Sequence, residues 1–438
     1  MRDYMKIGVV GLWHLGEIYS ACLSDLGHTV IAIDENAAVV ANLNQGVPPL
    51  AEPKLNQILN RTLKNGRLQF TTDFKLLANC DALWVTIDTP VDKRDKANPN
   101  KIFALIKRAL PYLQNGIILV VSSQIPVGTS AKISKLIKTQ RKNFTFDYAY
   151  IPENLRLGAA VDSFMKPARI VIGIDNRNRV EDLIKVFKKL KTNILTVNVA
   201  SAEMIKHATN AFLATSLCFI YDIADVCEQV GADVVEVTQG LRADKRIGHE
   251  AYLDASAGFS GGHLERDLQY LRQVAKLKHI QLPVINSVYR KNSQRRNIVL
   301  TRITPLLGTF KNKTATFFGL TYKSGTPTLA RSLPITLAKD LRKQGAHINL
   351  LDPAVTKAAI TKEIKAYDCN YFTDPYAAVK GSQVIICITP WPELKQLNFT
   401  KIGKAMASPK LFFDARNYFL DVRSLIEATG IKYIGVGR

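Results

Sequence analysis

The hydrophobic period of the chain changes twice, and this limits the possible folds more than any single motif does. Up to about residue 200, strand-like apolar runs alternate with helical stretches, which is typical of a parallel sheet covered by helices. From Ser201 to Val230, apolar residues recur at helical spacing with no glycine or proline. After Pro305 the alternation returns. We therefore expect two doubly wound α/β domains, residues 1–200 and 306–438, joined by a central all-α segment with a long helix, residues 201–305.

The two alternating regions also resemble each other. DALWVTIDTP, which begins at Asp81, and SQVIICITPW, which begins at Ser382, are both buried-strand patterns closed by Thr-Pro. The expected strands are Lys6–Val10, His28–Ile33, Asp81–Ile87, Ile117–Ser122, Ala149–Tyr150 and Arg169–Ile174, then Thr314–Gly319, Ile348–Leu351, Gln383–Ile388 and Lys410–Asp414. The expected helices, besides the long one, are Leu15–Leu26, Leu264–Ala275, Pro283–Ile303 and Leu333–Gln344.

The chain is strongly basic, with 59 Lys and Arg against 37 Asp and Glu and a formal net charge of +22. Nucleic-acid phosphates and small anions such as dinucleotides and sugar nucleotides both favour such a charge. However, the charges are dispersed, and the densest cluster, residues 290–297, lacks the interleaved aromatic side chains of a single-strand binding surface. A solvated lysine-rich surface is the simplest interpretation, and we expect no specific nucleic-acid partner.

The six cysteines form no CxxC pair and no cysteine–histidine spacing that suits zinc, so we expect no metal site. Most of them lie in apolar runs, as small buried hydrophobic residues do, which fits a reducing cytoplasm. The first residues begin a strand rather than a signal peptide. Because no apolar stretch reaches about 18 residues without interruption, we expect no membrane span.

A glycine turn follows the first strand. GLWHLG, Gly11 to Gly16, stands between a strand and a helix, and Asp34 ends the next strand. This arrangement is typical of Rossmann-like dinucleotide sites, in which the helix amino terminus faces the pyrophosphate and the carboxylate binds the adenosine ribose. A purely structural turn is the alternative, since Trp13 replaces the usual middle glycine. Asp34 favours NAD over NADP because it would repel a 2′-phosphate.

Several further motifs occur in order and at sensible spacings along nearly the whole chain. They are IDTP (87–90), IPVGT (125–129), PENLRLG (152–158), AEMIKHATNAFLAT (202–215), GFSGG (258–262) and DARN (414–417). With them the chain resembles the UDP-glucose/GDP-mannose dehydrogenase family. The resemblance implies oxidation of the primary alcohol of a nucleotide-linked sugar to a carboxylate in two NAD-dependent steps. It also implies an NAD domain, a helical dimerisation core and a nucleotide-binding domain. The cofactor residues it implies are Gly11, Trp13, Leu15, Gly16, Asp34, Thr89 and Pro90.

Alcohol oxidation requires a proton acceptor and donors that stabilise a developing oxyanion. Lys206 and Asn210 share one face of the long helix at i, i+4 spacing, although a lysine on an apolar helix could also simply extend to solvent. The resemblance makes this pair the catalytic Lys and Asn of the family. It likewise makes Asp267 the acid that activates water and Glu153 the residue that acts with it, whereas surface carboxylates are the alternative. Gln124 stands where the family has threonine.

The resemblance also implies the residues that bind the sugar nucleotide. Arg246, in DKRIG, matches the arginine that reaches the substrate across the dimer, and Arg416 of DARN matches a contact in the last domain. The remaining implied substrate residues are Leu155, Gly258, Phe259, Gly261, Gly262 and Lys323.

The chain departs from the family at the nucleophile. Where the family reads GYGGSCFPKD, this chain reads GFSGGHLERD, so His263 replaces the cysteine that holds the aldehyde as a covalent adduct. An imidazole cannot replace a thiolate like for like. Either the aldehyde hydrates and Asp267 or His263 removes a proton from the gem-diol, or oxidation stops after one step. A third possibility is that His263 only fills the position. Asn154 and Leu157 also depart from PEFLREG.

We therefore expect a cytoplasmic, dimeric, NAD-dependent nucleotide-sugar 6-dehydrogenase that acts on UDP-glucose or an N-acetylated UDP-hexose, with the dimer formed through residues 201–230. The alternatives are a β-hydroxyacid dehydrogenase, a non-catalytic nucleotide-sugar binder, a nucleic-acid binder, and a dehydrogenase of another substrate. The second α/β domain argues against the first alternative. Retention of Lys206, Asn210, Asp267 and Glu153 argues against a degraded enzyme.

Overall fold

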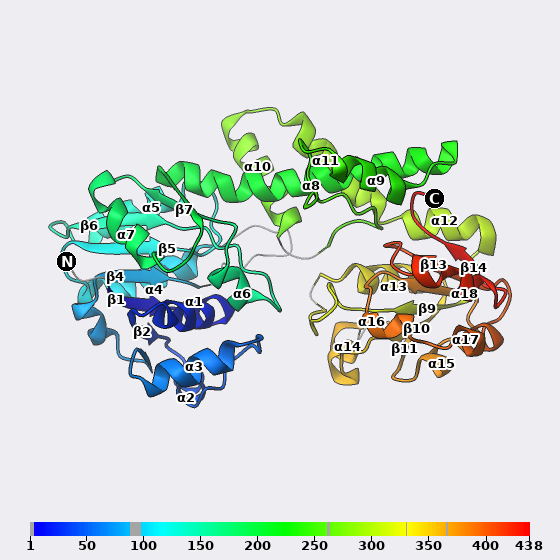
Figure 1. Cartoon of the computed structure of the whole chain (residues 1–438), viewed down its shortest axis with the longest axis horizontal. Coiled ribbons are helices and arrows are strands. Elements are labelled where there is room, and N and C mark those ends of the chain that lie inside the picture. Colours follow the sequence, from blue (N-terminus) through cyan, green and yellow to red (C-terminus); the bar gives the residue numbers. More distant parts are fainter. Residues whose placement is uncertain (1–3, 88–97, 261–262, 330, 365–366) are drawn as a thin grey trace. The chain divides into compact units, whose positions relative to one another are not determined.

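The computed structural model describes residues 4–87, 98–260, 263–329, 331–364 and 367–438. The chain divides into two compact units, Met1–Ala208 and Thr209–Arg438. Each unit contains one parallel or mainly parallel sheet, which confirms the two doubly wound domains expected from the sequence (Figure 1).

The first unit is built on an eight-stranded sheet in the order β3-β2-β1-β4-β5-β6-β7-β8. All its neighbouring strands are parallel except β6 and β7, which are antiparallel. The strands are β1 (Lys6–Val10), β2 (Thr29–Ile33), β3 (Leu68–Thr71), β4 (Ala82–Val85), β5 (Ile117–Val121), β6 (Phe146–Tyr150), β7 (Arg169–Ile174) and β8 (Asn193–Val197).

Helices cover both faces of this sheet because its central strands are apolar on both sides. In β4, Ala82 and Trp84 belong to one core and Leu83 and Val85 to the other. The first core is covered by α1 (His14–Asp25), α2 (Ala37–Asn44), α3 (Leu55–Lys64), α6 (Ala160–Met165) and α7 (Val180–Val186). The second is covered by α4 (Asn100–Ala109) and α5 (Thr129–Gln140), and short 3₁₀ helices span Phe74–Asn79, Leu110–Tyr112 and Arg177–Arg179.

The long helix expected at Ser201–Val230 is confirmed as α8, which spans Val199–Val230. By length and composition alone, α8 could cross a membrane, with a mean hydropathy of 1.3 over its most apolar window. However, it carries Glu203, Lys206 and His207 as buried polar side chains, each with a hydrogen-bond partner. These contacts are those of a helix packed within a protein core.

The second unit has six parallel strands in the order β11-β10-β9-β12-β13-β14. They are β9 (Thr314–Phe318), β10 (His347–Leu351), β11 (Cys369–Phe372), β12 (Val384–Cys387), β13 (Leu411–Asp414) and β14 (Lys432–Ile434). Around them lie α13 (Leu333–Lys343), α14 (Lys357–Ile364), α15 (Pro375–Ala378), α16 (Pro392–Lys395), α17 (Phe399–Ala405), α18 (Arg423–Glu427) and a 3₁₀ helix at Leu420–Val422.

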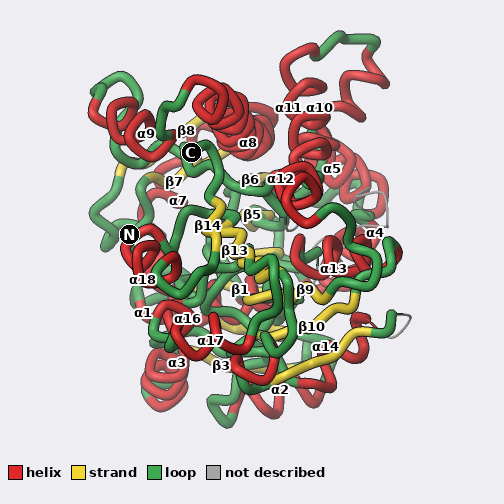
Figure 2. Tube along the Cα trace, turned by 90° about the vertical axis from the view of Figure 1, so that its right-hand side faces the viewer, coloured by secondary structure: helices red, strands yellow, loops and turns green. Residues whose placement is uncertain are grey.

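The other helices of this unit are α9 (Val234–Ala243), α10 (Leu264–Lys278), α11 (Pro283–Arg295) and α12 (Ile298–Leu307). Helices α10 and α11 lie side by side (Figures 1 and 2). Tyr221 of α8, Ile298 of α12 and Phe317 of β9 belong to one continuous core, so the helical segment and the second sheet are packed together. The division into three domains at residues 200/201 and 305/306 stays a prediction.

Some element boundaries differ from those expected. The run Pro283–Ile303 is two helices, α11 and α12, broken at Arg296 and Asn297, and α12 continues past Pro305 to Leu307. The short strands β3, β8, β11 and β14 were not expected. All four have partly exposed residues and lie at or next to sheet edges, so their apolar pattern is weak.

The resemblance between the two regions extends to atomic detail. In both units the first strand ends at a glycine with positive φ, +92° at Gly11 and +81° at Gly319, and the amide of each donates to the last residue of the neighbouring strand. The next amide donates to an aspartate after that strand: Leu12 N to Asp34 at 2.7 Å, and Leu320 N to Asp352 at 2.6 Å. One turn design is therefore used twice.

Candidate active site

The residues at the carboxyl end of β1 fit an adenine dinucleotide. A Cβ on Gly16 would lie 1.9 Å from the carbonyl oxygen of Gly11, so only glycine allows α1 to begin this close to the turn. Trp13, the N-cap residue of α1, makes no side-chain cap bond, so in the described part of the chain this helix start is suited to a phosphate. We call residues 11–16 the cofactor turn.

Trp13 is not part of the core beneath the cofactor turn. It is 51 % exposed, whereas Leu15, two residues later, is buried in the core. Two other expected cofactor residues, Thr89 and Pro90, lie outside the described residues.

Asp34 and Asp352 occupy equivalent places but differ in how many hydrogen bonds they already accept. Asp34 is half-buried and accepts from Leu12 N and, at 2.9 Å, from Asn36 N. Asp352 is buried and accepts from Leu320 N, Thr321 N, Ala354 N and the Trp391 indole, the last at 3.2 Å. Since a carboxylate has about four acceptor positions, Asp34 retains capacity for a ribose diol and Asp352 does not.

Lys206 and Glu153 lie together in the first unit. Lys206, only 7 % exposed, donates from Nζ to the Glu153 carbonyl oxygen at 2.6 Å and approaches its Oε1 at 3.4 Å. Glu153 Oε2 in turn accepts from the backbone amide of Leu155 at 2.9 Å. A buried ammonium that faces a carbonyl and a carboxylate is positioned to donate to an additional oxygen. The lysine is therefore not simply extended to solvent, which was the alternative.

Asn210 and Asp267 lie together in the second unit. Asp267, in the first turn of α10, is completely buried, and the side-chain amide of Asn210 donates to its Oδ2. Lys206 and Asn210 are one turn apart on the continuous helix α8. The structure thus pairs each of the two expected helix donors with one of the two expected carboxylates.

Two residues that sequence analysis did not single out fix helix α8 to the loop after β5. Glu203, almost completely buried, accepts from Gly128 N, Ser130 N and the Ser130 hydroxyl. The ring of His207, also buried, bonds to the carbonyl oxygen of Ile125 at 3.0 Å. These contacts flank Lys206 on α8 and hold the buried Gln124 beside Ile125. Glu203 and His207 lie three residues before and one residue after Lys206, and this proximity in sequence could have identified them.

The loop of residues 256–260 is held by side chains that were also missed. Asn292 of α11 accepts from Phe259 N at 2.9 Å and donates to Phe259 O at 3.1 Å. Arg295 donates to Ser256 O at 2.9 Å. Gly258 and Phe259 are buried beneath these contacts, and the expected Gly261 and Gly262 lie outside the described residues. Asn292 and Arg295 belong to the basic cluster of residues 290–297, so this cluster is partly internal.

His263 immediately precedes α10 and is exposed. No cysteine offers an activated thiol in its place, because burial raises the pKa of each of the six thiols. A nucleophilic cysteine requires a lowered pKa. The six thiols therefore do not favour covalent trapping of an aldehyde by a cysteine.

The remaining expected substrate residues are not gathered into one described cluster. Arg246 is almost fully exposed and forms a bidentate ion pair with Asp244, at 2.6 and 3.1 Å. Lys323 and Arg416 are also exposed, while Leu155 is half-buried. No group of three or more potential metal ligands was found in the described ranges.

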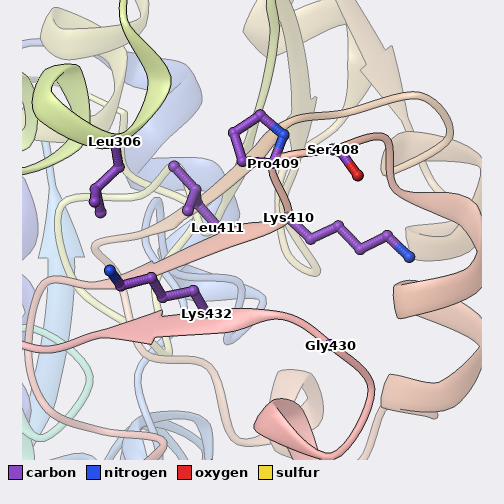
Figure 3. Close-up of a pocket in the computed structure, with 7 residues that line it drawn as sticks. All are labelled: Leu306, Ser408, Pro409, Lys410, Leu411, Gly430 and Lys432. Atoms are coloured by element: carbon purple, nitrogen blue, oxygen red, sulfur yellow. The ribbon is translucent and has the colours of Figure 1, made fainter.

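A surface pocket of about 510 Å³ lies elsewhere, at the amino ends of β13 and β14 (Figure 3). Its two lysines, Lys410 and Lys432, extend in opposite directions, and Lys410 donates to Gly403 O at 2.6 Å. They do not converge on one anion. In doubly wound sheets ligands bind at the carboxyl ends of the strands, so we do not assign this pocket to the reaction.

The two doubly wound sheets, the cofactor turn and the paired Lys and Asn define a nucleotide-dependent dehydrogenase with two nucleotide-binding domains. The chain belongs to the UDP-glucose/GDP-mannose dehydrogenase family: its NAD binding domain matches residues 5–191, its central domain 200–294 and its UDP binding domain 316–421. It is thus an NAD-dependent nucleotide-sugar dehydrogenase.

Individual relatives agree over the whole length. The chain is 31% identical over 436 residues to UDP-glucose 6-dehydrogenase of Rickettsia conorii, covering 99% of both chains. It is 31% identical over 437 residues to UDP-glucose 6-dehydrogenase TuaD of Bacillus subtilis, covering 99% of this chain and 93% of TuaD. Among solved structures, a UDP-glucose dehydrogenase from the archaeon Pyrobaculum islandicum superposes with a TM-score of 0.87 at 26% identity, covering 99% of this chain and 97% of that one.

Proposed function

We propose that the chain oxidises the C6 primary alcohol of a UDP-linked hexose, UDP-glucose or an N-acetylated relative, to the uronic acid. The relatives named for UDP-glucose support this choice of sugar nucleotide. The observation that carries the proposal is the retention of both donor–carboxylate pairs, Lys206 with Glu153 and Asn210 with Asp267.

In the first step the alcohol proton leaves to a base while hydride leaves C6 and the C–O bond becomes a carbonyl. Bound NAD supplies the hydride acceptor, held by the cofactor turn and Asp34. Lys206 and Asn210 donate to the substrate oxygen as negative charge develops on it. Asp267 accepts the proton and Glu153 keeps Lys206 oriented, since each already contacts its helix partner.

In the second step water adds to the aldehyde to give a gem-diol. Asp267 or His263 removes one of its hydroxyl protons while the second hydride leaves C6, for which a second molecule of NAD would be the acceptor, and the product is the carboxylic acid. Gln124 and Glu153 orient the water. This route needs no thiol, which agrees with His263 and with the raised pKa of every cysteine in the chain.

We further propose that the active form is a cytoplasmic homodimer. Phe212, Phe219, Val226 and Val230 are 49–71% exposed and recur at spacings of seven, seven and four residues along α8; we call them the α8 stripe. Apolar side chains in such a row are covered in most soluble proteins, and a second copy of α8 would cover them. Arg246 would then reach the substrate of the other subunit after leaving Asp244.

The proposal is tested by counting NADH formed per sugar consumed over a panel of UDP- and GDP-sugars, with product mass from the same samples. We expect two NADH and a gain of about 14 mass units with one UDP-hexose, because a CH2OH group becomes a carboxyl group. One NADH with a loss of about two mass units would show that oxidation ends at the aldehyde. Binding without NADH would overturn the proposal in favour of a nucleotide-sugar binder.

A further inference from the structure

One carboxylate in the first unit joins the cofactor turn to the loop that carries Glu153. Glu52 has no exposed side-chain surface, and its Oε1 lies 2.8 Å from His14 Nε2 and 2.8 Å from Gly158 N. Its Oε2 accepts from Ala160 N at 3.1 Å. His14 is the first residue of α1 and follows Trp13 in the cofactor turn, whereas Gly158 ends the PENLRLG loop, residues 152–158.

The bond between His14 and Glu52 is largely shielded from solvent. The His14 side chain is only 17% exposed, and both carboxylate oxygens of Glu52 are already committed to protein donors. His14 Nε2 and the amide of Gly158 both contact Oε1 of Glu52. A movement of the His14 ring would therefore shift the oxygen that accepts from Gly158. Charge-assisted bonds between buried groups are sensitive to such displacements.

A second acid lies close to Glu52. Glu17, three residues after His14 on α1, is completely buried, and no described side chain bonds to its carboxyl oxygens. Burial, together with the neighbouring Glu52, raises the pKa of Glu17 to about 8, and the backbone of Leu50 only partly opposes this effect. At neutral pH Glu17 is therefore mostly uncharged, and Glu52 is the carboxyl of this pair that His14 and the two amides contact.

We propose that His14 and Glu52 are positioning residues that couple occupation of the cofactor turn to the order of the PENLRLG loop. Binding at the turn fixes the amino terminus of α1 and with it His14. Glu52 is then held in place to bind Gly158 and Ala160, and the loop presents Glu153 to Lys206. Any effect of this coupling on turnover rests on the proposed function. The coupling itself can be measured without a sugar nucleotide.

The test uses hydrogen exchange of the segment 152–165 with NADH as the only ligand. In the wild type, we expect saturating NADH to slow exchange in this segment by about fivefold or more. In His14→Ala the slowing is lost even when NADH, whose affinity for this variant is measured separately, is raised to saturation. Glu52→Gln, which keeps an acceptor but removes the charge, has the same effect if it folds.

Lys54→Met is the matched control. Lys54 and Asp162 also join the segment around Glu52 to α6, at 2.6 and 2.8 Å, but this ion pair is exposed and does not touch His14. The control retains the slowing. If the wild type shows no slowing, or if His14→Ala retains it, the coupling is refuted. A wild type that binds NADH and shows coupling but turns over no sugar nucleotide would refute the proposed substrate alone.

Discussion

Lys206 and Asp267 differ from ordinary surface charges because both are buried and each already has a defined partner. Lys206→Ala would remove the proposed donor to the developing oxyanion, and Asp267→Asn would remove the proposed base, so each should lower kcat by about a hundredfold or more. Circular dichroism checks that the fold is intact, and NADH absorbance measures kcat. Lys138→Ala, an exposed change on α5, serves as the control. A rate within about threefold of wild type for either active-site variant would contradict the assignment.

Glu17 makes stability depend on pH. Its pKa is about 8 in the folded chain against an ordinary value of 4.5. As the pH rises from about 4.5 to 8, the unfolded chain loses this proton and the folded chain keeps it. The free energy of unfolding therefore falls over this range, by on the order of a few kcal/mol.

We expect Glu17→Gln to remove this dependence, so that its Tm exceeds that of the wild type at pH 8 by more than at pH 5. Thermal unfolding at the two pH values measures the difference. Glu181→Gln, at an exposed glutamate of α7, should leave the two wild-type values unchanged. Equal pH dependence in Glu17→Gln and wild type would show that Glu17 ionises normally.

Helix α8 contributes to both the core and the proposed dimer because its faces differ. Ala214, Tyr221 and Ala224 are buried in the core of the second unit, whereas the α8 stripe is exposed. Phe219→Glu places a charge within the stripe, and we expect it to convert the dimer to a monomer and to lower activity at least about tenfold through loss of Arg246 from the neighbouring site. Leu425→Glu, an equally severe change at a 63% exposed residue of α18, should remain dimeric. Light scattering during gel filtration measures both variants, and a fully active monomer would contradict the proposal.

Elements were predicted from the sequence where their pattern was long or buried on both sides. Strands β1, β4 and β12 and helix α8 belong to this group, and the turn at Gly11 was recognisable from the strand and Asp34 around it. The break between α11 and α12 was not predictable, since no glycine or proline marks Arg296 and Asn297. Only tertiary contacts determine it.

The site was predicted less completely than the fold because its side chains are also brought together by tertiary contacts. Spacing brought Lys206 and Asn210 to one helix face, but the pairing of Lys206 with Glu153 depends on contacts across 53 residues. Asn292 and Arg295 were missed because a run of basic and amide residues normally indicates a solvated surface. Their burial against the 256–260 loop follows from the packing of α11, which no local pattern reveals.

The net charge of +22 is distributed over the whole molecule rather than concentrated at the densest basic cluster. Lys291 pairs with Asp222 and Asp225, at 2.6 and 2.7 Å, and Arg296 pairs with Glu265 at 2.7 Å. Arg295 is buried and pairs with Asp225. The cluster of residues 290–297 is thus largely compensated, and it offers no continuous track for a phosphate backbone.

The repeated turn at Asp34 and Asp352 has a consequence for how two similar ligands are kept apart. Both substrates of the reaction carry a ribose and a diphosphate, so a duplicated fold with two equally receptive carboxylates would let each ligand compete for the other's place. Trp391 and three backbone amides already saturate Asp352, whereas Asp34 has room to accept more. If the sugar nucleotide binds in the second unit as proposed, an excess of NAD should fill the first unit and leave the second to the sugar nucleotide, so that high cofactor levels do not inhibit the enzyme.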